Sequence, residues 1–204
     1  MDNGEELDRA KIEEAFRIMG RYLLERGTLG EITIYGGSAI LFQFDWRRTS
    51  EDVDARIISG GHHGLVTQAA EQAAKQLDLP RSWLNESVAM YARRQEQDSD
   101  RIFVGVYPSP ERVGVVAAKP SYILAMKLNA LERSTVNDRD FQDAVNLGIA
   151  CGVSTAEALR KVFREFFPDQ ELPGAAELRL NELARAIGSR QPLNESTTCP
   201  APKR

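Results

Sequence analysis

The hydrophobic positions in the first half of the chain follow the spacings of both helices and strands. In residues 5–26, apolar side chains recur at the spacing of one helical face. Shorter apolar runs predict strands. The elements predicted in this half are a helix at residues 5–26, a strand at 31–35, a helix at 39–44 capped by Ser38, a strand at 52–58, a helix at 65–77, and strands at 101–107 and 113–118. The proline-containing segment 108–112 predicts a hairpin turn between the last two strands.

The pattern changes after residue 118, where only helical spacing remains. Helices are predicted at residues 120–133, 137–151, 155–167 and 175–187. The final segment is polar and contains prolines, a composition typical of disorder. The chain is therefore predicted to be an α/β protein with an α/β domain at residues 1–119, a helical C-terminal region at 120–188 and a disordered tail at 189–204.

Composition limits the class of protein further. The 204 residues are 42 % hydrophobic and 27 % charged, with a net charge of −4, which is typical of a soluble globular protein. No apolar run approaches the roughly 20 residues that cross a membrane, and the acidic N-terminus differs from a secretory signal. The cysteines, Cys151 and Cys199, predict no disulfide framework, so a cytoplasmic location is expected. The mild acidity argues against a broad phosphate-binding surface, although it allows a small basic pocket.

Asp52 and Asp54 form the first candidate site. Residues two apart in a strand point to the same face, so both carboxylates are expected there, with Val53 in the core. Adjacent carboxylates repel, and a divalent cation offsets the repulsion. Mg²⁺ uses such ligands together with substrate phosphates, and two ions can clamp both oxygens of a phosphoryl transfer. The alternative is a strand end where both aspartates meet water, which is the commoner origin of an isolated Asp-x-Asp.

Gly36, Gly37 and Ser38 interrupt the chain between the first predicted strand and the next helix. A turn of this kind exposes backbone N–H groups at a helix N-terminus, where phosphate binds, and the missing side chains let phosphate come close. Ser38 adds a hydroxyl donor. The alternative is an ordinary tight turn with a serine cap. The turn and the aspartate pair together, separated by residues 39–51, are rarer than either feature alone.

Lys127 lies on or beside the apolar stripe of the helix predicted at residues 120–133, three positions after Leu124. A lysine there either extends its ammonium group into solvent or meets an anion. Asp140 and Asp143, one turn apart in the next predicted helix, are candidate partners. The alternative for either aspartate is an ordinary surface ion pair with a neighbouring arginine.

Several other residues carry weaker signals. Arg47 and Arg48 precede the aspartate strand and are candidates to bind a triphosphate or nucleic acid, with a solvated loop as the alternative. His62 and His63 are expected in a flexible glycine-rich loop, because two histidines without further ligands give little support for a zinc site. Trp83 is expected in the core rather than stacked on a base.

Together these motifs resemble the polymerase-β-like nucleotidyltransferase superfamily. Its fingerprint is Gly-Gly or Gly-Ser, about a dozen residues, then Asp-apolar-Asp in a strand, as at Gly37-Ser38 and Asp52-Val53-Asp54. The lead-in "RRTSEDVD" is similar to the AbiEii-type toxin branch and to small bacterial nucleotidyltransferase-like proteins. The segments "WLNES", "PSYILAMKLNAL" and "NDRDFQDAVNL" strengthen the similarity to the latter group, so the resemblance covers roughly residues 30–150.

The resemblance implies a small mixed β-sheet with flanking helices and a metal-dependent activity. A nucleoside monophosphate would move from an NTP to a hydroxyl acceptor with Mg²⁺, in a one- or two-ion site. The implied roles are metal binding for Asp52 and Asp54, triphosphate binding for Gly36, Gly37, Ser38 and Arg48, phosphate neutralisation for Lys127, and a further acid at Asp140 or Asp143.

The acceptor stays open at this point. Similarity to the toxin branch implies a tRNA 3′ end and an antitoxin protein as partner. A small hydroxylated molecule such as an aminoglycoside is the second hypothesis. The third is a catalytically silent module that binds a nucleotide or a protein, because the predicted strands 101–107 and 113–118 lack the third carboxylate of the fuller family pattern.

Overall fold

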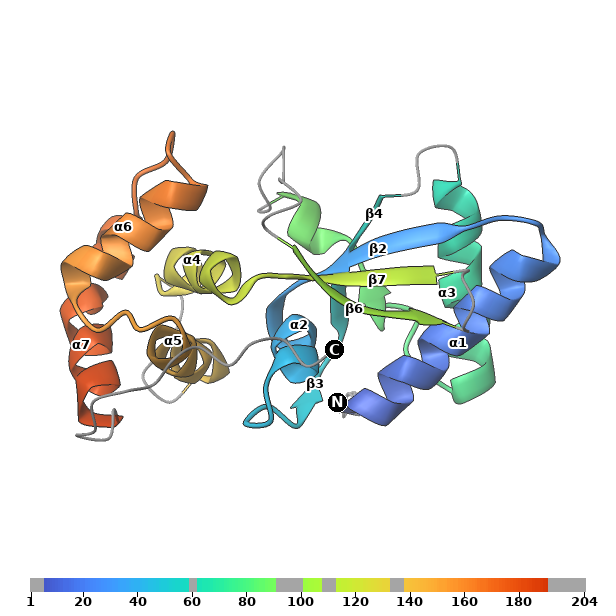
Figure 1. The fold of residues 1–204 in the computed structure, drawn as a ribbon, viewed down its shortest axis with the longest axis horizontal. Helices are drawn as coiled ribbons and strands as arrows, with labels where there is room; N and C mark the ends of the chain where they lie inside the picture. The colour runs from blue at the N-terminus through green and yellow to red at the C-terminus, as the bar shows by residue number, and fades with distance from the viewer. Residues whose placement is uncertain (1–5, 59–61, 91–100, 108–112, 133–137, 191–204) are drawn as a thin grey trace. The chain divides into compact units, whose positions relative to one another are not determined.

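The protein is a mixed α/β chain that divides into two compact units. The structure is a computed structural model, and it describes residues 6–58, 62–90, 101–107, 113–132 and 138–190. The N-terminal unit is Met1–Lys119 and the C-terminal unit is Pro120–Arg204. The described residues form seven α-helices, a five-stranded mixed sheet and a two-stranded sheet, which confirms the α/β class (Figure 1).

The N-terminal unit holds the strands of the described residues. In chain order its elements are β1 (Leu7–Asp8), α1 (Arg9–Glu25), β2 (Gly30–Ile34), α2 (Gly36–Gln43), β3 (Thr49–Ser50), β4 (Val53–Ile57), α3 (His63–Leu77), β5 (Leu84–Asn85), the 3₁₀ turn η1 (Ser87–Met90), β6 (Arg101–Tyr107) and β7 (Val113–Ala118). The strands predicted at residues 101–107 and 113–118 are confirmed, and they pair antiparallel as a hairpin requires. The predicted turn at 108–112 lies outside the described residues.

The five-stranded sheet has the order β5-β4-β2-β7-β6, and β1 pairs with β3 separately. Strand β2 runs parallel to β7 and β4 runs parallel to β5, whereas the β2–β4 and β6–β7 pairs are antiparallel. Strands β1, β3 and β5 were not predicted, because two residues are too short to show a periodic pattern. The central position of β2 places the turn that follows it next to the start of β4.

The sheet has one core face and one polar face. Directly paired residues share a face, and Ile34 pairs with Ala55 and Ala117, all of which are buried. Helix α1 contacts β6 and β7, and the ring centroid of Phe16 lies 5.6 Å from that of Tyr107. The same pairing register places a second set of residues on the opposite face. This polar face carries Glu31, Thr33, Asp54, Arg56, Asn85, Arg101, Phe103 and Val116.

Helices of the N-terminal unit begin at residues that differ from the predicted ones. Helix α1 begins at Arg9, because the Asp8 side chain caps it. Helix α2 begins at Gly36 and α3 at His63, each earlier than predicted. The flexible loop predicted for His63 is therefore wrong: its Nε2 lies 2.6 Å from Oε2 of Glu86, at the start of a regular helix.

The C-terminal unit is helical, as the sequence pattern predicted. Its elements are α4 (Pro120–Ala130), α5 (Arg139–Ala150), α6 (Ala156–Phe166) and α7 (Gly174–Arg190). Its core includes the stacked rings of Tyr122 and Phe166, whose centroids are 5.0 Å apart. Helix α7 runs to Arg190, so residues 189 and 190 of the predicted disordered tail are helical. The remainder of that tail lies outside the described residues.

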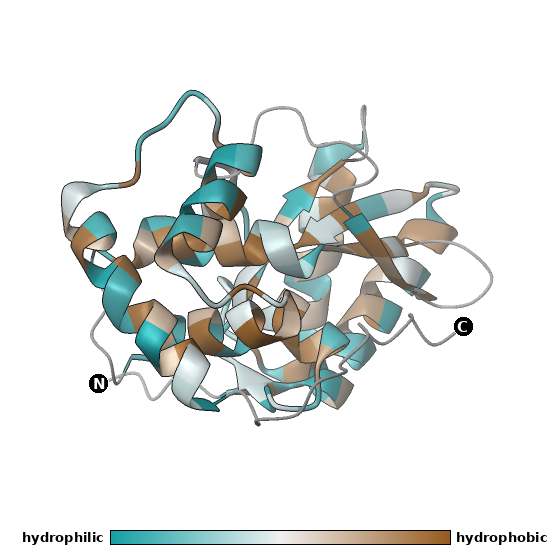
Figure 2. Ribbon diagram, turned by 60° about the vertical axis from the view of Figure 1, so that its left-hand side comes forward, coloured by the Kyte–Doolittle hydropathy of each residue, from teal (hydrophilic) through white to brown (hydrophobic). Residues whose placement is uncertain are grey.

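Hydropathy follows the division between buried and exposed positions. In Figure 2 the helices show alternating brown and teal stretches, as expected for helices with one buried and one exposed side. Among the described residues, no helix combines the length and apolar character needed to cross a membrane.

Candidate functional site

Asp52 and Asp54 flank the buried Val53 at the start of β4. The strand begins at Val53, so Asp52 precedes it instead of belonging to it as predicted. Asp54 pairs with Asn85 on β5, and the Asn85 side-chain Nδ2 donates a 2.9 Å hydrogen bond to Oδ2 of Asp52. A single amide side chain therefore neighbours both aspartates, and both carboxylates lie toward the polar face of the sheet.

The turn at Gly36 lies directly against the Asp54 carboxylate. The backbone N–H of Tyr35 donates a 2.9 Å hydrogen bond to the carbonyl oxygen of Asp54. Gly36 has a φ of 57°, in the left-handed region that favours glycine. A Cβ atom on Gly36 would lie 2.8 Å from Oδ2 of Asp54. The glycine therefore allows both the backbone conformation and the close carboxylate, so the turn and Asp54 form one site.

Gly37 is covered by Arg47, a residue that the sequence could not distinguish from its neighbour Arg48. A Cβ atom on Gly37 would lie 2.6 Å from Nη2 of Arg47 and 2.7 Å from Oγ of Ser50. The Arg47 Nε donates a 2.7 Å hydrogen bond to the carbonyl oxygen of Thr49, which fixes the guanidinium over the turn. Arg48 is exposed. The structure therefore brings both Arg47 and Asp54 to the glycine turn.

Ser38 does not cap α2, which corrects the sequence prediction. The N-cap is Tyr35, and it makes no side-chain capping hydrogen bond. Ser38 is buried within the first turn, where its Oγ donates a 2.9 Å hydrogen bond to the carbonyl oxygen of Tyr35. The cap was misplaced because the helix starts at Gly36 rather than after the serine. The first N–H groups of a helix lack intrahelical acceptors, so the glycine backbone supplies the donors at this turn.

Lys127 forms a charged cluster with Asp140 and Asp143 inside the C-terminal unit. The Lys127 Nζ is ion-paired with Oδ1 of Asp140 and lies 3.3 Å from Oδ2 of Asp143. The side chain of Lys127 is 12 % exposed and that of Asp143 only 4 %, whereas that of Asp140 is 44 % exposed. Of the alternatives left open by the sequence, the structure shows the pairing with Lys127, and an ordinary surface pair describes Asp140 but not the buried Asp143.

Trp83 and His63, which carried weaker sequence signals, both have structural roles. Trp83 is buried, and its Nε1 donates a 3.0 Å hydrogen bond to the carbonyl oxygen of Ala70, so the core prediction is confirmed. Glu86 accepts a hydrogen bond from the backbone N–H of Ile57 and also contacts His63, so it links the start of α3 to β4. These contacts hold the scaffold around the aspartates.

The donor set at β4 fits a magnesium ion whose coordination is completed by substrate. Asp52 and Asp54 offer carboxylate oxygens, and Mg²⁺ is commonly held by one or two carboxylates plus substrate phosphates. Gly37, which lies beneath Arg47, and the N-terminus of α2 are suited to bind the phosphate groups that would complete the coordination of the ion. Within the described ranges, no group of three or more His, Cys, Asp or Glu residues forms an all-protein metal site.

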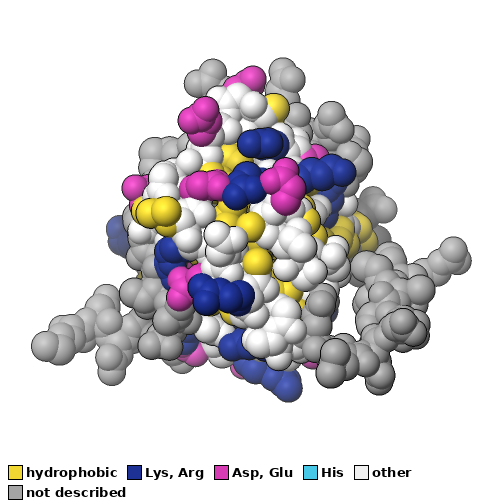
Figure 3. Space-filling model, turned by 90° about the vertical axis from the view of Figure 1, so that its left-hand side faces the viewer, with side chains coloured by type: hydrophobic (Ala, Val, Ile, Leu, Met, Phe, Trp, Pro, Cys, Tyr) yellow, Lys and Arg dark blue, Asp and Glu magenta, His cyan; other side chains and the backbone are white. Residues whose placement is uncertain are grey.

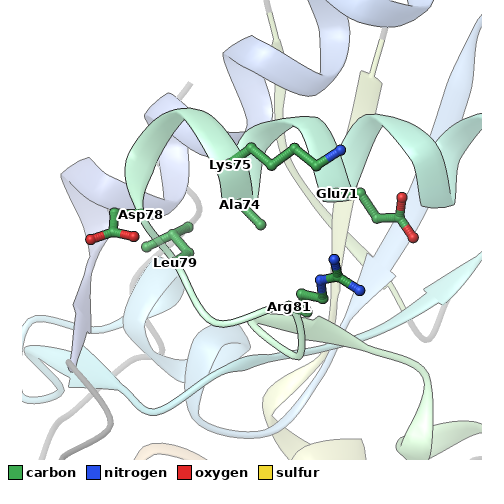
Figure 4. A pocket seen from close by; sticks show the side chains of 6 residues that line it. All are labelled: Glu71, Ala74, Lys75, Asp78, Leu79 and Arg81. Carbon is green, nitrogen blue, oxygen red and sulfur yellow. The ribbon is translucent and has the colours of Figure 1, made fainter.

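A surface pocket at the end of α3 is another candidate site. It has a volume of about 220 Å³ and is lined by Glu71, Ala74, Lys75, Asp78, Leu79 and Arg81 (Figure 4). The four charged residues are exposed, and their two acids and two bases balance. Such a depression has neither the close backbone approach nor the fixed polar groups of the glycine turn.

Charges on the helical unit also balance locally. Arg160 donates to Glu157 at 2.7 Å and to Glu177 at 2.6 Å, and the hydrogen bond to Glu177 raises the pKa of Arg160. Figure 3 shows basic and acidic side chains next to one another on the displayed face. This mixed pattern differs from the continuous basic tract that binds nucleic acid through phosphates alone.

Comparison with known proteins found no match, so the functional proposal depends on the geometry of the site. No protein-family model matches the chain, and no curated protein or solved structure matches it either.

Proposed function

We propose that the protein is a magnesium-dependent nucleotidyltransferase that moves a nucleoside monophosphate from an NTP to a hydroxyl acceptor and releases pyrophosphate. The observation that supports this most strongly is the contact between the Asp54 carboxylate and Gly36. It joins a pair of metal-binding carboxylates to a turn suited to phosphate within one site. A phosphate bound at that turn would lie beside the metal ligands, as nucleotidyl transfer requires.

Each residue of the site has a role in this proposal. Asp52 and Asp54 hold Mg²⁺, with Asn85 fixing the orientation of Asp52. The ion, when bound, neutralises charge on the phosphate oxygens. The backbone N–H groups of Gly36 and Gly37 bind the triphosphate at the positive end of the α2 dipole. Catalysis would come mainly from positioning and electrostatic stabilisation.

The two arginines would act differently in this site. Arg47 supplies a guanidinium directly over Gly37, where it can pair with a phosphate oxygen. Arg48, which is exposed, would contact a more distant part of the triphosphate. The buried hydroxyl of Ser38 supports the turn through its bond to Tyr35.

The resemblance to the superfamily adds roles that the N-terminal unit does not supply. It assigns phosphate neutralisation to Lys127 and a further acid to Asp140 or Asp143. Burial favours Asp143 as a structural anchor and Asp140 as the acid accessible to a ligand. The proposal includes a cytoplasmic location, a tRNA 3′ end as acceptor and an antitoxin partner, with an aminoglycoside-type acceptor as the alternative.

The test is transfer of label from an α-³²P-labelled NTP in the presence of Mg²⁺, with total tRNA or aminoglycosides offered as acceptors. Asp54→Asn keeps the shape of the side chain and removes its charge. The variant should lose several kcal/mol of transition-state stabilisation, so its transfer rate should be roughly 10³-fold lower than that of the wild type. The control is Asp169→Asn, which changes an exposed aspartate in the segment after α6 and should leave transfer unchanged.

One observation favours a catalytically silent, nucleotide-binding module as the second candidate. Strands β6 and β7 contain no acidic residue that could complete a three-carboxylate site. No labelled product with any acceptor, combined with equal NTP affinity of the wild type and Asp54→Asn, would support this module and contradict the transferase.

A further inference from the structure

Asn85 is the neutral side chain that the structure places beside both aspartates of the candidate site. It is the register partner of Asp54 in the parallel pairing of β4 with β5, so the two side chains lie on the same face of the sheet. Its Nδ2 donates a 2.9 Å hydrogen bond to Oδ2 of Asp52. Asp52 has further contacts, but Oδ2 is the oxygen that Asn85 holds. One amide therefore engages one particular oxygen of the carboxylate pair.

The orientation of the Asn85 amide is set by its other end. The backbone N–H of Ser87 donates a 3.0 Å hydrogen bond to Oδ1 of Asn85. A backbone N–H can only donate and an ionised carboxylate can only accept, so the amide oxygen faces Ser87 and the NH₂ group faces Asp52. A turn closed by the Ser87 contact needs only the amide oxygen. The bond to Asp52 is therefore an additional interaction that the local turn does not explain.

The neighbours of Asn85 hold it in place against β4. Two residues earlier, the side chain of Trp83 is buried, and its carbonyl oxygen accepts a 2.6 Å hydrogen bond from the backbone N–H of Val53. One residue later, Oε1 of Glu86 accepts a 3.2 Å hydrogen bond from the backbone N–H of Ile57. Asn85 is therefore anchored to β4 on both sides, as expected for a residue that positions a metal ligand.

The number of oxygens that a carboxylate offers distinguishes Mg²⁺ from Ca²⁺. Mg²⁺ requires a near-ideal octahedron with ligands at about 2.0–2.1 Å, whereas Ca²⁺ accepts about six to eight oxygens at about 2.3–2.6 Å and often takes both oxygens of a carboxylate. A bidentate carboxylate must turn both oxygens toward the ion. Because the Asn85 donor competes for Oδ2 of Asp52, it disfavours the bidentate arrangement.

We propose that Asn85 selects Mg²⁺ over Ca²⁺ at the site of Asp52 and Asp54, because it restricts Asp52 to coordination through a single oxygen. This inference rests on the proposed function, in which the two aspartates hold a divalent ion. Asn85 acts as a positioning residue, through Asp52. A neutral donor suits this role, since a lysine or arginine would cancel part of the negative charge that attracts the cation.

Direct coordination of the ion by Asn85 fits its hydrogen bonds less well. The amide oxygen is the atom that a hard cation binds, and this oxygen faces Ser87. The NH₂ group toward Asp52 is a donor and offers no lone pair to an ion. A purely structural Asn85 would affect the stability of the fold but would leave the preference between two divalent ions unchanged.

The test measures Mn²⁺ binding to the full chain by electron paramagnetic resonance, with MgCl₂ or CaCl₂ as the competitor. Mn²⁺ shares the preference of Mg²⁺ for oxygen ligands, and Asp54→Asn identifies the part of the signal that belongs to this site. Asn85→Leu keeps the approximate size of the side chain and removes the donor. Mg²⁺ affinity should fall about 10- to 100-fold, as when other partners of metal ligands are removed. Ca²⁺ affinity should fall about tenfold less, because Asp52 can then offer both oxygens.

Asn85→Asp provides a second readout that altered packing would not produce. It preserves the shape of the side chain and replaces the donor with a third carboxylate, so Ca²⁺ affinity should rise above that of the wild type. The matched control is Asn181→Leu, which changes an exposed asparagine on α7 and should leave both affinities unchanged. Circular dichroism checks the fold of each variant, and Asn85→Asp alone decides the result if Asn85→Leu does not fold.

The outcomes separate this inference from the proposed function. An unchanged ratio of Mg²⁺ to Ca²⁺ affinity in Asn85→Leu, or a Ca²⁺ affinity of Asn85→Asp that does not exceed the wild-type value, would overturn the role of Asn85. If Mn²⁺ binding still depends on Asp54, either result would leave the metal site supported. Wild-type protein without Asp54-dependent Mn²⁺ binding would contradict both the metal site and the selectivity. A changed ratio without nucleotide transfer to any acceptor would support the role of Asn85 and contradict the transferase.

Discussion

The two units of the protein hold their aspartates in different ways. In the N-terminal unit, Asp52 accepts a hydrogen bond from a neutral amide, and Asp54 lies against a glycine turn. In the C-terminal unit, Asp140 and Asp143 are both paired with Lys127. The first pair is half-buried at the start of a strand, whereas Asp143 and Lys127 are among packed helices.

Under the proposed function the first pair binds a cation, whereas the ion pairs and burial give the second pair a stabilising role within the fold. A buried ion pair balances desolvation against attraction, and removing one partner leaves an uncompensated charge. A pair of carboxylates near a phosphate-binding turn can bind a cation together with a nucleotide. Stability measurements should therefore respond to the C-terminal cluster, and nucleotide chemistry should respond to the N-terminal pair.

The largest expected effect on stability comes from breaking the C-terminal cluster. Lys127→Met keeps the side-chain length and leaves the buried Asp143 without its lysine. The free energy of unfolding should fall by about 3–5 kcal/mol, as for other broken buried ion pairs. Asp54→Asn should change it by only about 1 kcal/mol or less. Urea denaturation followed by circular dichroism measures both values.

A double variant provides the control for this comparison. Lys127→Met combined with Asp143→Leu removes both buried charges, so it should recover most of the lost stability. If Lys127→Met alone is as stable as the wild type, the cluster does not support the fold, and the contrast between the two units disappears.

A smaller effect is expected from Gly27 and Gly36, the glycines with positive φ among the described residues of the N-terminal unit. Gly27→Ala places a Cβ in open space, so it should cost only the backbone penalty of about 1–2 kcal/mol. Gly36→Ala adds a Cβ that collides with Oδ2 of Asp54, so it should lower stability further and also lower the transfer rate. Thermal unfolding and the NTP-transfer assay distinguish the two contributions. Equal behaviour of both variants would show that the contact with Asp54 has no consequence.

The smallest expected effect concerns Thr33, in the centre of the polar face. Its buried Oγ1 has no hydrogen-bond partner in the part of the chain that the structure describes, in contrast to the paired charges of the C-terminal cluster. Thr33→Val preserves the shape and removes the hydroxyl, so unfolding free energy should stay constant or rise by up to about 1 kcal/mol. Thr33→Ser keeps the hydroxyl and removes the methyl group, so it should be less stable than Thr33→Val. A clear loss of stability in Thr33→Val would mean that the hydroxyl is satisfied in solution.

Much of the secondary structure could be predicted from the local pattern. Strands β6 and β7 match their predicted ranges, and four helices follow the last strand. These elements have one side in the core, so burial leaves a periodic trace in the sequence. The start of α2 was misplaced because a serine after two glycines is a common cap, whereas here the positive φ of Gly36 lets the helix begin earlier.

The candidate site was only partly predictable for a related reason. Asp52, Asp54 and the glycines were identified because a short motif lies within one stretch of sequence. Asn85 was missed as a site residue, and Arg47 was named only as a weak candidate together with Arg48. Nothing local separates Arg47 from Arg48, and Asn85 lies on a two-residue strand.

The sequence by itself determined the α/β class, the helical C-terminal region and the aspartate pair, and it left Lys127 either extended into solvent or paired with an anion. Only the tertiary structure decided that Asp54 lies against Gly36, that Arg47 covers Gly37, and that Asn85 donates to Asp52. Periodicity reports how each segment divides its own surface between core and solvent. The register between distant strands depends on the packing of the whole sheet, and that register brings the functional side chains together.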